Sequence, residues 1–341
     1  MDLADFDYVL PAGAIAQAPP ETRDGARLLV IDRARGALSD RTVVELPALL
    51  RAGDCLVVND SRVIPARVLA EDAAGKPVEL LFVEPVGEGA WRAMVRPGRR
   101  CRPGVHLRAG AARLRVVAAD EDGTRLIVRE NGAIAALLET AGMPPLPPYI
   151  ARHAKPAPED WERYQTVYAR TPGSVAAPTA GLHFSDALLD RLRAAGVDVH
   201  ALTLHVGPAT FRPITTPTIE SHTLPSERAV VTAATAAAVN AARAEGRRVV
   251  AVGTTVTRTL ESAAGEDGRL AAFEGRASIY IRPGHRFRVV DALLTNFHLP
   301  RSSLLVLVAA FAGRELILRA YRHALDAGYR FYSYGDATLI E

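Results

Sequence analysis

A block of short strand-like runs interrupts a chain that otherwise alternates between helical and extended segments. Turns rich in glycine, proline and aspartate separate the runs, which occupy residues 78–84, 91–95, 104–107, 112–117 and 124–128. Short strands at such close spacing predict a small antiparallel β-barrel. A helix is expected next, over residues 131–142. The six prolines between Pro144 and Pro158 cannot continue a helix or a central strand, so this segment is interpreted as a linker.

The sequence on both sides of this block predicts an α/β domain. Apolar runs indicate strands over residues 28–32, 55–60, 197–204 and 247–252. Ser185 can cap the first of three helices, Gly253–Thr255 is expected to form a turn, and the helices are predicted over residues 186–196, 232–246 and 257–264. Alternating helices and strands form layered α/β domains. We therefore expect a discontinuous α/β domain from residues 1–65 and 150–341, with residues 66–149 as an inserted barrel domain and its linker.

Cysteine usage and the apolar runs indicate the compartment. Cys55 and Cys101 form no CxxC pair and have no close histidine partner, which fits a reducing compartment and argues against disulfides or structural zinc. The N-terminal residues MDLADFDYVL place acidic side chains ahead of apolar ones, unlike a signal peptide. The longest apolar run, residues 304–312, is shorter than the roughly 20 residues that span a bilayer. We expect a cytoplasmic, monomeric protein without a membrane partner.

The basic residues are almost all arginine. The formal net charge is +3, and Lys76 and Lys155 are the two lysines among 41 basic residues. Arginine is the better planar partner for phosphate and for stacking on bases. Scarce lysine with abundant alanine equally fits a bias in genome base composition. Charge alone is therefore weak evidence for nucleic-acid binding.

Polar and ring side chains gather in loops that follow predicted strands, where ligands of α/β domains bind. These loops are residues 59–67, 178–184, 204–213, 253–258, 293–303 and 333–337. Each has a purely structural alternative, such as a turn at Asn59–Ser61, a helix cap at Gly253, or a satisfied core histidine. An imidazole nevertheless recurs three times beside Gly, Asn or Thr, at His183, His205 and His298. That repetition favours a functional site over three unrelated structural histidines.

Several familiar sites are absent from the sequence. It has no GxxxxGK[ST] phosphate loop, no GxGxxG after a strand, no GxSxG elbow and no HExxH. No Cys–His or carboxylate cluster has metal-ligand spacing, and the glycine-rich loop usual in methyltransferases is missing. The small residues of 172–184, PGSVAAPTAGLHF, instead allow backbone to approach backbone or a ligand closely. A nucleotide-type ligand would be held in a less common way.

Long blocks of the chain resemble the S-adenosylmethionine:tRNA ribosyltransferase-isomerases. The similarity covers nearly the whole chain in order, through NDSRVIPAR, YQTVYARTPGSVAAPTAGLHF, LHVGPATFRP, AVGTTVTRTLES, DALLTNFHLPRSSLLVLVAAFAG and YRFYSYGDATLI. The resemblance implies an α/β domain with an inserted β-barrel, which agrees with the pattern above.

The resemblance also implies a reaction. S-adenosylmethionine donates its ribosyl part to 7-aminomethyl-7-deazaguanine at the wobble position of a tRNA with a GUN anticodon. Adenine and methionine leave, and the ribose isomerises to give epoxyqueuosine. No metal or redox cofactor is implied, because the sulfonium supplies the driving force and S-adenosylmethionine is a substrate. The family name also points to a transferase and isomerase of queuosine biosynthesis.

This chemistry needs a base for the carbon beside the sulfonium, an acid for departing adenine, and a group that keeps the amine neutral. The candidates are His183, His205, His298 and Asp60, with the roles left open among them. Phe184 or Phe211 could stack on a base, and Thr254, Thr255 and Arg258 could bind the methionine carboxylate at a helix N-terminus. The full set expected to bind S-adenosylmethionine is Asn59, Ser61, Arg62, Thr179, Gly181, Phe184, Gly207, Thr210, Phe211, Gly253, Thr254, Thr255, Arg258, Asn296, Tyr334 and Asp336.

Basic residues near the expected barrel junction are candidates for tRNA contacts. Arg62 lies close to them, and the predicted tRNA-binding set is Arg67, Arg96, Arg99, Arg100 and Arg102. The structural alternative is that residues 96–104, RPGRRCRPG, form a solvated hairpin loop.

The chain departs from the usual pattern of the family it resembles. Ala209 stands where glycine is usual, Pro225 replaces a histidine, and the other departures are Val256, Thr257, Ala277, Ser278 and Tyr280. These changes admit a diverged S-adenosylmethionine-dependent transferase with another acceptor, or a non-catalytic tRNA- or nucleoside-binding relative. The three retained histidines favour an enzyme.

Overall fold

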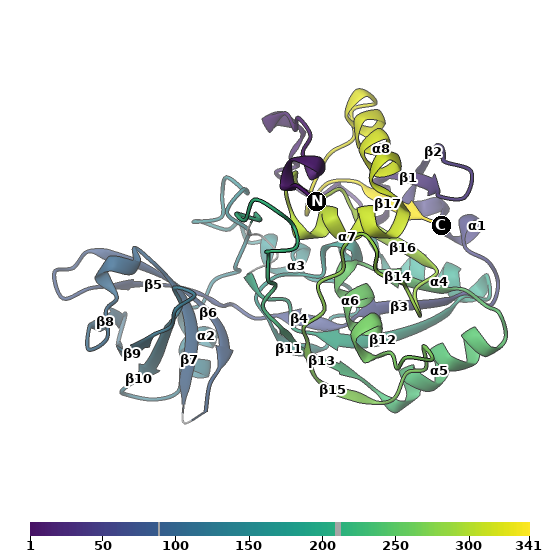
Figure 1. Ribbon diagram of the computed structural model, residues 1–341. Coiled ribbons are helices and arrows are strands. Elements are labelled where there is room, and N and C mark those ends of the chain that lie inside the picture. The colour runs from purple at the N-terminus through teal and green to yellow at the C-terminus, as the bar shows by residue number, and fades with distance from the viewer. Residues whose placement is uncertain (88, 209–212) are drawn as a thin grey trace. The chain divides into compact units, whose positions relative to one another are not determined.

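The computed structural model describes residues 1–87, 89–208 and 213–341, and this chain divides into two compact units. The first, the main unit, comprises Met1–Ser61, Gln165–Thr171 and Ala177–Glu341 (Figure 1). The second, the barrel unit, comprises Arg62–Tyr164 and Pro172–Ala176. The barrel unit thus extends beyond the predicted range of 66–149.

The proline-rich segment explains this difference. The guanidinium of the buried Arg67 donates hydrogen bonds to the carbonyls of Leu146, at 2.9 Å, and of His153. Ile150 is fully buried as well. The prolines keep this segment out of helices and central strands. These contacts nevertheless fix it within the barrel unit, so it is not a free linker.

The main unit is built on a nine-stranded mixed sheet, in the order β15-β13-β12-β3-β14-β16-β17-β1-β2. Strands β12, β3, β14 and β16 run parallel to one another, as do β17 and β1. The strands are β1 (Arg27–Asp32), β2 (Ala37–Thr42), β3 (Cys55–Asn59), β12 (Asp198–Leu204), β13 (Glu227–Val231), β14 (Val249–Val252), β15 (Phe273–Ala277), β16 (Ala292–Asn296) and β17 (Ala337–Ile340).

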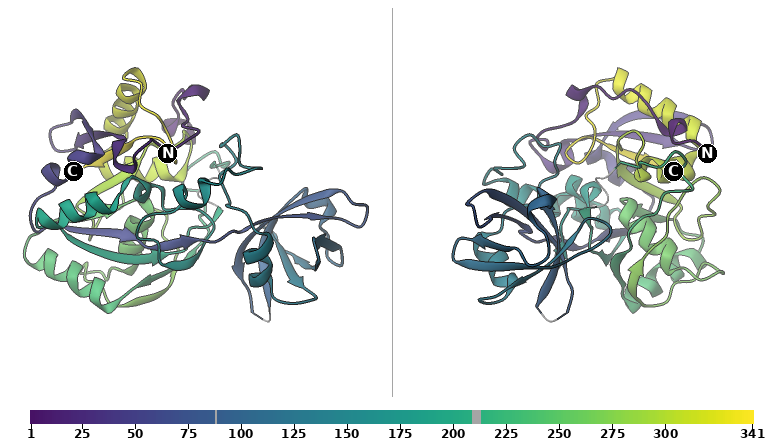
Figure 2. Two further views of the ribbon diagram at one scale, coloured as in Figure 1. Left: turned by 180° about the vertical axis from the view of Figure 1, so that it is seen from behind. Right: turned by 60° about the vertical axis from the view of Figure 1, so that its left-hand side comes forward.

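Helices flank this sheet, with α4 over one face and α6 over the other (Figures 1 and 2). Ser185 caps α4 as predicted, since its hydroxyl accepts a hydrogen bond from the Leu188 N–H at 3.1 Å. Helix α6 begins at Thr254, earlier than predicted, because Gly253 alone makes the turn with a φ of 91°. The helices are α1 (Leu46–Leu49), α4 (Asp186–Ala194), α5 (Ala233–Ala244), α6 (Thr254–Ala263), α7 (Ser303–Ala312) and α8 (Arg314–Asp326).

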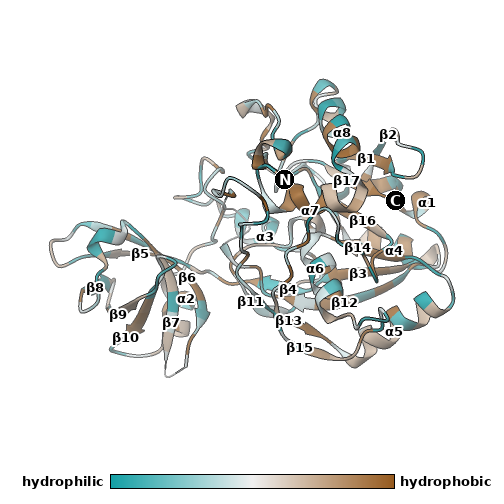
Figure 3. Cartoon of the chain, in the orientation of Figure 1, coloured by the Kyte–Doolittle hydropathy of each residue, from teal (hydrophilic) through white to brown (hydrophobic). Residues whose placement is uncertain are grey.

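Alternate strand residues build the core of the main unit. Leu56 and Val58 of β3 and Val250 and Val252 of β14 point to one face and pack with Leu188 and neighbouring leucines of α4. This is the period of two that a strand imposes on its side chains. Figure 3 shows hydrophobic colour along these strands, whereas the helix α8 carries both hydrophilic and hydrophobic colour. None of the helices in the described ranges has the length and apolarity needed to cross a membrane.

The barrel unit contains a closed antiparallel barrel in the order β10-β7-β6-β5-β8-β9. Alternate residues such as Val78, Leu80 and Phe82 fill its interior, and Leu137 and Leu138 of α2 pack against them. The predicted fold class is therefore confirmed. The elements are β4 (Ser61–Val63), β5 (Arg67–Glu71), β6 (Pro77–Pro85), β7 (Ala90–Arg96), β8 (His106–Ala109), β9 (Ala112–Ala119), β10 (Arg125–Arg129), α2 (Ile134–Ala141), α3 (Asp160–Arg163) and β11 (Thr171–Ser174).

Candidate active site

The carboxyl ends of four parallel strands meet at one edge of the main sheet. Strand β3 ends at Asn59, β12 at Leu204, β14 at Val252 and β16 at Asn296. Parallel strands bring these ends together although they lie far apart in the sequence. Ligands of α/β domains bind at this edge.

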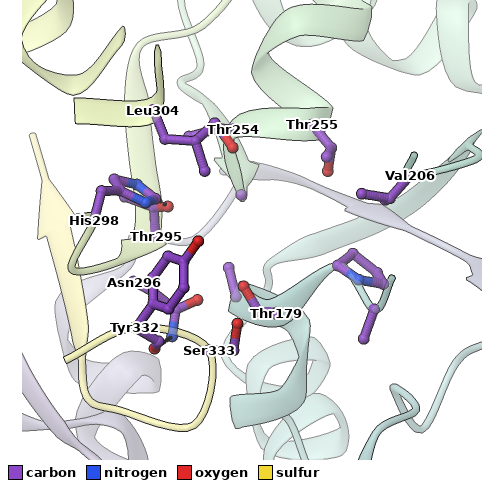
Figure 4. A pocket seen from close by; sticks show the side chains of 14 residues that line it. Thr179, Val206, Thr254, Thr255, Thr295, Asn296, His298, Leu304, Tyr332 and Ser333 are labelled. Atoms are coloured by element: carbon purple, nitrogen blue, oxygen red, sulfur yellow. Dashed lines mark hydrogen bonds between the residues drawn. The ribbon is translucent and has the colours of Figure 1, made fainter. Parts of the chain in front are cut away.

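A cavity of about 50 Å³ lies at this edge (Figure 4). Nucleoside-sized ligands fill pockets of roughly 300 Å³ or more, so the cavity as it stands is smaller than such a ligand. Hydroxyl and amide groups are frequent in its lining, and no carboxylate occurs among its described residues. The lining residues are Ala177, Pro178, Thr179, Ala180, Val206, Gly253, Thr254, Thr255, Thr295, Asn296, His298, Leu304, Tyr332 and Ser333.

Small residues explain how two walls of the cavity come together. Gly253 precedes α6 with a φ of 91°, which favours glycine, and a Cβ there would be in ordinary contact with the Cβ of Ala180 at 3.5 Å. A Cβ on Gly181 would meet the Tyr168 hydroxyl at 2.2 Å, so only glycine allows this approach. The run of small residues that ends at His183 therefore serves close packing, and four of its members, residues 177–180, also line the cavity.

Of the described residues that line the cavity, His298 is the one histidine. Its Nε2 lies 3.1 Å from the Thr295 hydroxyl, and its backbone N–H donates to the Tyr321 hydroxyl at 3.1 Å. Burial lowers its pKa to about 3, because a charged imidazole loses its hydration there. His298 is therefore neutral near pH 7.

His183 lies behind the cavity wall and contacts Asn296. Its Nε2 is 3.1 Å from the Asn296 Nδ2, which also donates to the Tyr332 carbonyl at 3.1 Å. Burial, with a smaller effect from Arg330, lowers the pKa of His183 to about 4. His183 is a neutral neighbour of a lining residue and is not a lining residue itself.

His205 and Asp60 lie near each other but are not among the residues that line the cavity. The Asp60 carboxylate accepts a hydrogen bond from the Thr203 hydroxyl at 2.6 Å. Burial and Arg228 lower the pKa of His205, whereas Asp60 raises it. The structure therefore brings His183 and His298 to one site and leaves these two beside it.

Asn59 has a structural role in the part of the chain that the structure describes. Its Oδ1 accepts the N–H groups of Ser61 and Leu204, and its Nδ2 donates to the Leu204 carbonyl at 3.0 Å. The Nδ2 also lies 3.5 Å from the Thr255 hydroxyl. Asn59 thus joins the ends of β3 and β12 to the first turn of α6, and Ser61 beside it is fully buried.

Arg258 pairs with Glu227 and does not line the cavity. The Arg258 Nη1 lies 2.5 Å from the Glu227 Oε2, and the Glu227 Oε1 accepts the Gly207 N–H at 2.7 Å. Both side chains of the pair are buried. Arg258, which the sequence suggests as a ligand of the methionine carboxylate, pairs here with a carboxylate of the chain itself, and that role stays a prediction.

Three further residues expected to bind S-adenosylmethionine have contacts within the protein, and their predicted roles stay predictions. Phe184 is fully buried in the core, where its ring packs against Tyr168. The Asp336 carboxylate accepts the N–H groups of Arg27 and Arg330 and holds a turn. Tyr334 is buried outside the cavity lining. Thr210 and Phe211, like Ala209, lie outside the described residues.

Replacing Glu227 with alanine should destabilise the main unit by about 3–5 kcal/mol, because Arg258 would remain buried without its partner. Chemical denaturation of both proteins measures this change. The matched control is Glu274→Ala, which removes an exposed partner of Arg228 and should change stability by less than about 0.5 kcal/mol. Equal denaturation midpoints for the two variants would contradict the assigned role.

The predicted tRNA-binding arginines separate into two groups. Arg67 is buried and engages backbone carbonyls and Glu79, so it cannot bind phosphate without disrupting the barrel unit. Arg100 is half-buried near Asp72. The exposed arginines are Arg62, Arg96, Arg99 and Arg102.

Sequence reasoning missed several lining residues. Thr295 and Leu304 lie in or beside a loop of the predicted site, but nothing in the sequence distinguishes their side chains. Tyr332 adopts a φ of 75°, which no sequence pattern of a tyrosine indicates. Ser333 follows it into the lining.

Comparisons with known proteins agree with this architecture. A family model described as "Queuosine biosynthesis protein" matches residues 3–340. An S-adenosylmethionine:tRNA ribosyltransferase-isomerase of Anaeromyxobacter dehalogenans is 52% identical, covering 100% of this chain and 99% of the relative. That of Moorella thermoacetica is 51% identical over 100% of both chains. The crystal structure of S-adenosylmethionine tRNA ribosyltransferase from Thermotoga maritima matches with a TM-score of 0.58 and 35% identity, covering 99% of this chain and 100% of that one.

Proposed function

The chain belongs to the S-adenosylmethionine:tRNA ribosyltransferase-isomerase family of queuosine biosynthesis, and from this premise we propose the reaction that it catalyses. It transfers the ribosyl moiety of S-adenosylmethionine to 7-aminomethyl-7-deazaguanine at the wobble position of a tRNA with a GUN anticodon, and isomerises it. The products are epoxyqueuosine-tRNA, adenine and methionine. The observation that carries this proposal is the full-length match at 52% identity.

S-adenosylmethionine binds across the cavity of the main unit, with its two ends against opposite walls. Thr254 and Thr255 begin α6, whose first N–H groups and dipole favour the methionine carboxylate. Figure 4 shows Thr254 and Thr255 on one side of the cavity and Asn296 and Ser333 on the other. We therefore place the methionine end at α6 and the adenine end near Asn296.

His298 acts as the base in this proposal. A fixed sulfonium charge acidifies the C–H bonds beside it, so a neutral imidazole can remove a proton there. The depressed pKa of His298 keeps the ring unprotonated at physiological pH, and Thr295 holds its Nε2 side. We do not assign this step to His205 or Asp60, because neither is among the described residues that line the cavity.

Adenine release tests the proposed reaction. The protein is incubated with S-adenosylmethionine, with and without an anticodon stem-loop that carries the aminomethyl-deazaguanine base. Adenine that appears only with this RNA, together with a matching mass gain on the RNA, is the expected result. A folded protein that binds S-adenosylmethionine but releases no adenine would refute the proposed acceptor and favour a diverged transferase.

The exposed arginines of the barrel unit are proposed to contact tRNA phosphates. Replacing Arg99 or Arg102 with alanine should weaken tRNA binding. Each substitution should also reduce the slope of log K against log salt by about 1 for every phosphate that the variant no longer neutralises. Filter binding over a range of salt concentrations measures this slope.

Arg41 provides the control, because it is exposed on β2 of the main unit. Arg41→Ala should leave the salt slope unchanged. The same slope for wild type and both barrel-unit variants would exclude Arg99 and Arg102 from the tRNA interface.

A further inference from the structure

Asn296 lines the cavity and carries a buried hydrogen-bond acceptor without a partner in the described parts of the chain. The side chain is 2% exposed, and this acceptor is its Oδ1. A buried polar atom without a partner is costly, so such an atom in a cavity marks a place where a ligand donates a hydrogen bond.

The orientation of this amide is fixed by its other contacts. The Nδ2 donates to the Tyr332 carbonyl at 3.1 Å, and a carbonyl can only accept. Turning the amide over would set the Oδ1 against that carbonyl oxygen, which is repulsive. The Oδ1 is therefore the atom left for the cavity, and Figure 4 shows Asn296 beside Thr179 and Ser333.

His183 completes this arrangement. The amide nitrogen has two protons, of which one goes to Tyr332 and the other to the His183 Nε2 at 3.1 Å. The Nε2 must then be an acceptor, so the ring is neutral and carries its proton on Nδ1. The buried surroundings favour that neutral form. His183 is a positioning residue that holds the amide of Asn296.

The lining of the cavity limits the donor that fits. A buried ammonium group needs a carboxylate partner, and none occurs among the described lining residues. A neutral N–H donor is therefore favoured. Ala177, Pro178 and Ala180 add small apolar surfaces that suit a planar ring.

We propose that the Asn296 Oδ1 accepts a hydrogen bond from the exocyclic amino group of adenine, with His183 and the Tyr332 carbonyl fixing the amide. This inference rests on the proposed function, because it takes S-adenosylmethionine as the ligand of the cavity. It makes Asn296 a specificity-determining residue that distinguishes an amino group from an oxo group on the purine.

The test compares the binding of S-adenosylmethionine with that of its 6-oxo analogue by titration calorimetry. The wild-type protein should bind the analogue roughly 10–100-fold more weakly, because an acceptor would then face the Asn296 Oδ1. In Asn296→Ala, the ratio of the two affinities should fall to less than about threefold. In His183→Ala, that ratio should become about ten times smaller than in the wild type.

Thr254→Val is the control, because it alters the proposed methionine end and should weaken both ligands equally. Circular dichroism and thermal melting establish whether each variant is folded. The wild-type comparison needs no variant, so equal affinity for the two ligands would overturn the inference even if Asn296→Ala fails to fold.

Four outcomes would overturn the inference. Equal wild-type affinity for both ligands would refute it while leaving the proposed function intact, and so would an unchanged preference in folded Asn296→Ala. An Asn296→Ala variant that keeps the preference but has a higher KM for the RNA would show that Asn296 contacts the acceptor amine instead. No binding of S-adenosylmethionine to the wild type would reject both this inference and the proposed function.

Discussion

Replacing His298 with alanine should lower turnover by about 10²–10⁴-fold while S-adenosylmethionine still binds. His298 is the imidazole among the described lining residues, and burial keeps it unprotonated. Without it, the carbon beside the sulfonium has no positioned base at this wall of the cavity. Single-turnover measurement of adenine release, at saturating RNA and S-adenosylmethionine, gives the rate of this step.

The matched control is His205→Ala. His205 is a half-buried imidazole of the same unit that lies outside the cavity lining, so its loss should change the single-turnover rate by less than about threefold. Calorimetric affinity for S-adenosylmethionine separates a loss of chemistry from a loss of binding. If His205→Ala abolished turnover and His298→Ala did not, the assignment of the base would be wrong.

Acid should destabilise the main unit between pH 6.5 and pH 4. An unfolded histidine binds its proton near pH 6.5, whereas folded His183 and His298 bind theirs only near pH 4 and pH 3. The unfolded state therefore carries more protons in this range. The contribution of these histidines to the free energy of unfolding is fully present above pH 6.5 and is lost as the pH falls. Each histidine should cost about 3 kcal/mol of stability by pH 4.

Thermal melting at intervals of half a pH unit measures this loss. Burial also lowers the pKa of His205 and His222, which adds a contribution of the same sign. His183→Gln removes one buried imidazole and should flatten the dependence of melting temperature on pH. A melting temperature that stays constant from pH 6.5 to pH 4.5 would contradict the burial of neutral histidines.

The part of the fold that follows from local pattern could be predicted. Period-two apolar runs indicate the strands, and Ser185 and Gly196 mark the limits of α4, with Gly196 at a φ of 82°. Parallel strands bring their carboxyl ends to one edge, so the loops that carry Asn296 and His298 could be expected near a shared edge of the sheet. These features depend on residues close in sequence or on general topology.

The partners of individual side chains could not be predicted in the same way. Arg258, Phe184 and Arg67 each look like ligand-binding residues, yet each is buried against a residue from another segment. The sequence gives the type of each side chain, but it does not show which distant residue that side chain will pair with. A pairing such as Arg258 with Glu227 appears only when α6 and β13 pack together.

The hydrogen bonds of Asn59 have a consequence for ligand binding. One amide joins the ends of two strands and touches the first turn of a helix, so three distant segments are locked together when the sheet forms. The loss of conformational freedom in these segments then occurs during folding and not when the substrate arrives. A site that is ordered before the substrate arrives lets the contacts with the substrate contribute more fully to affinity.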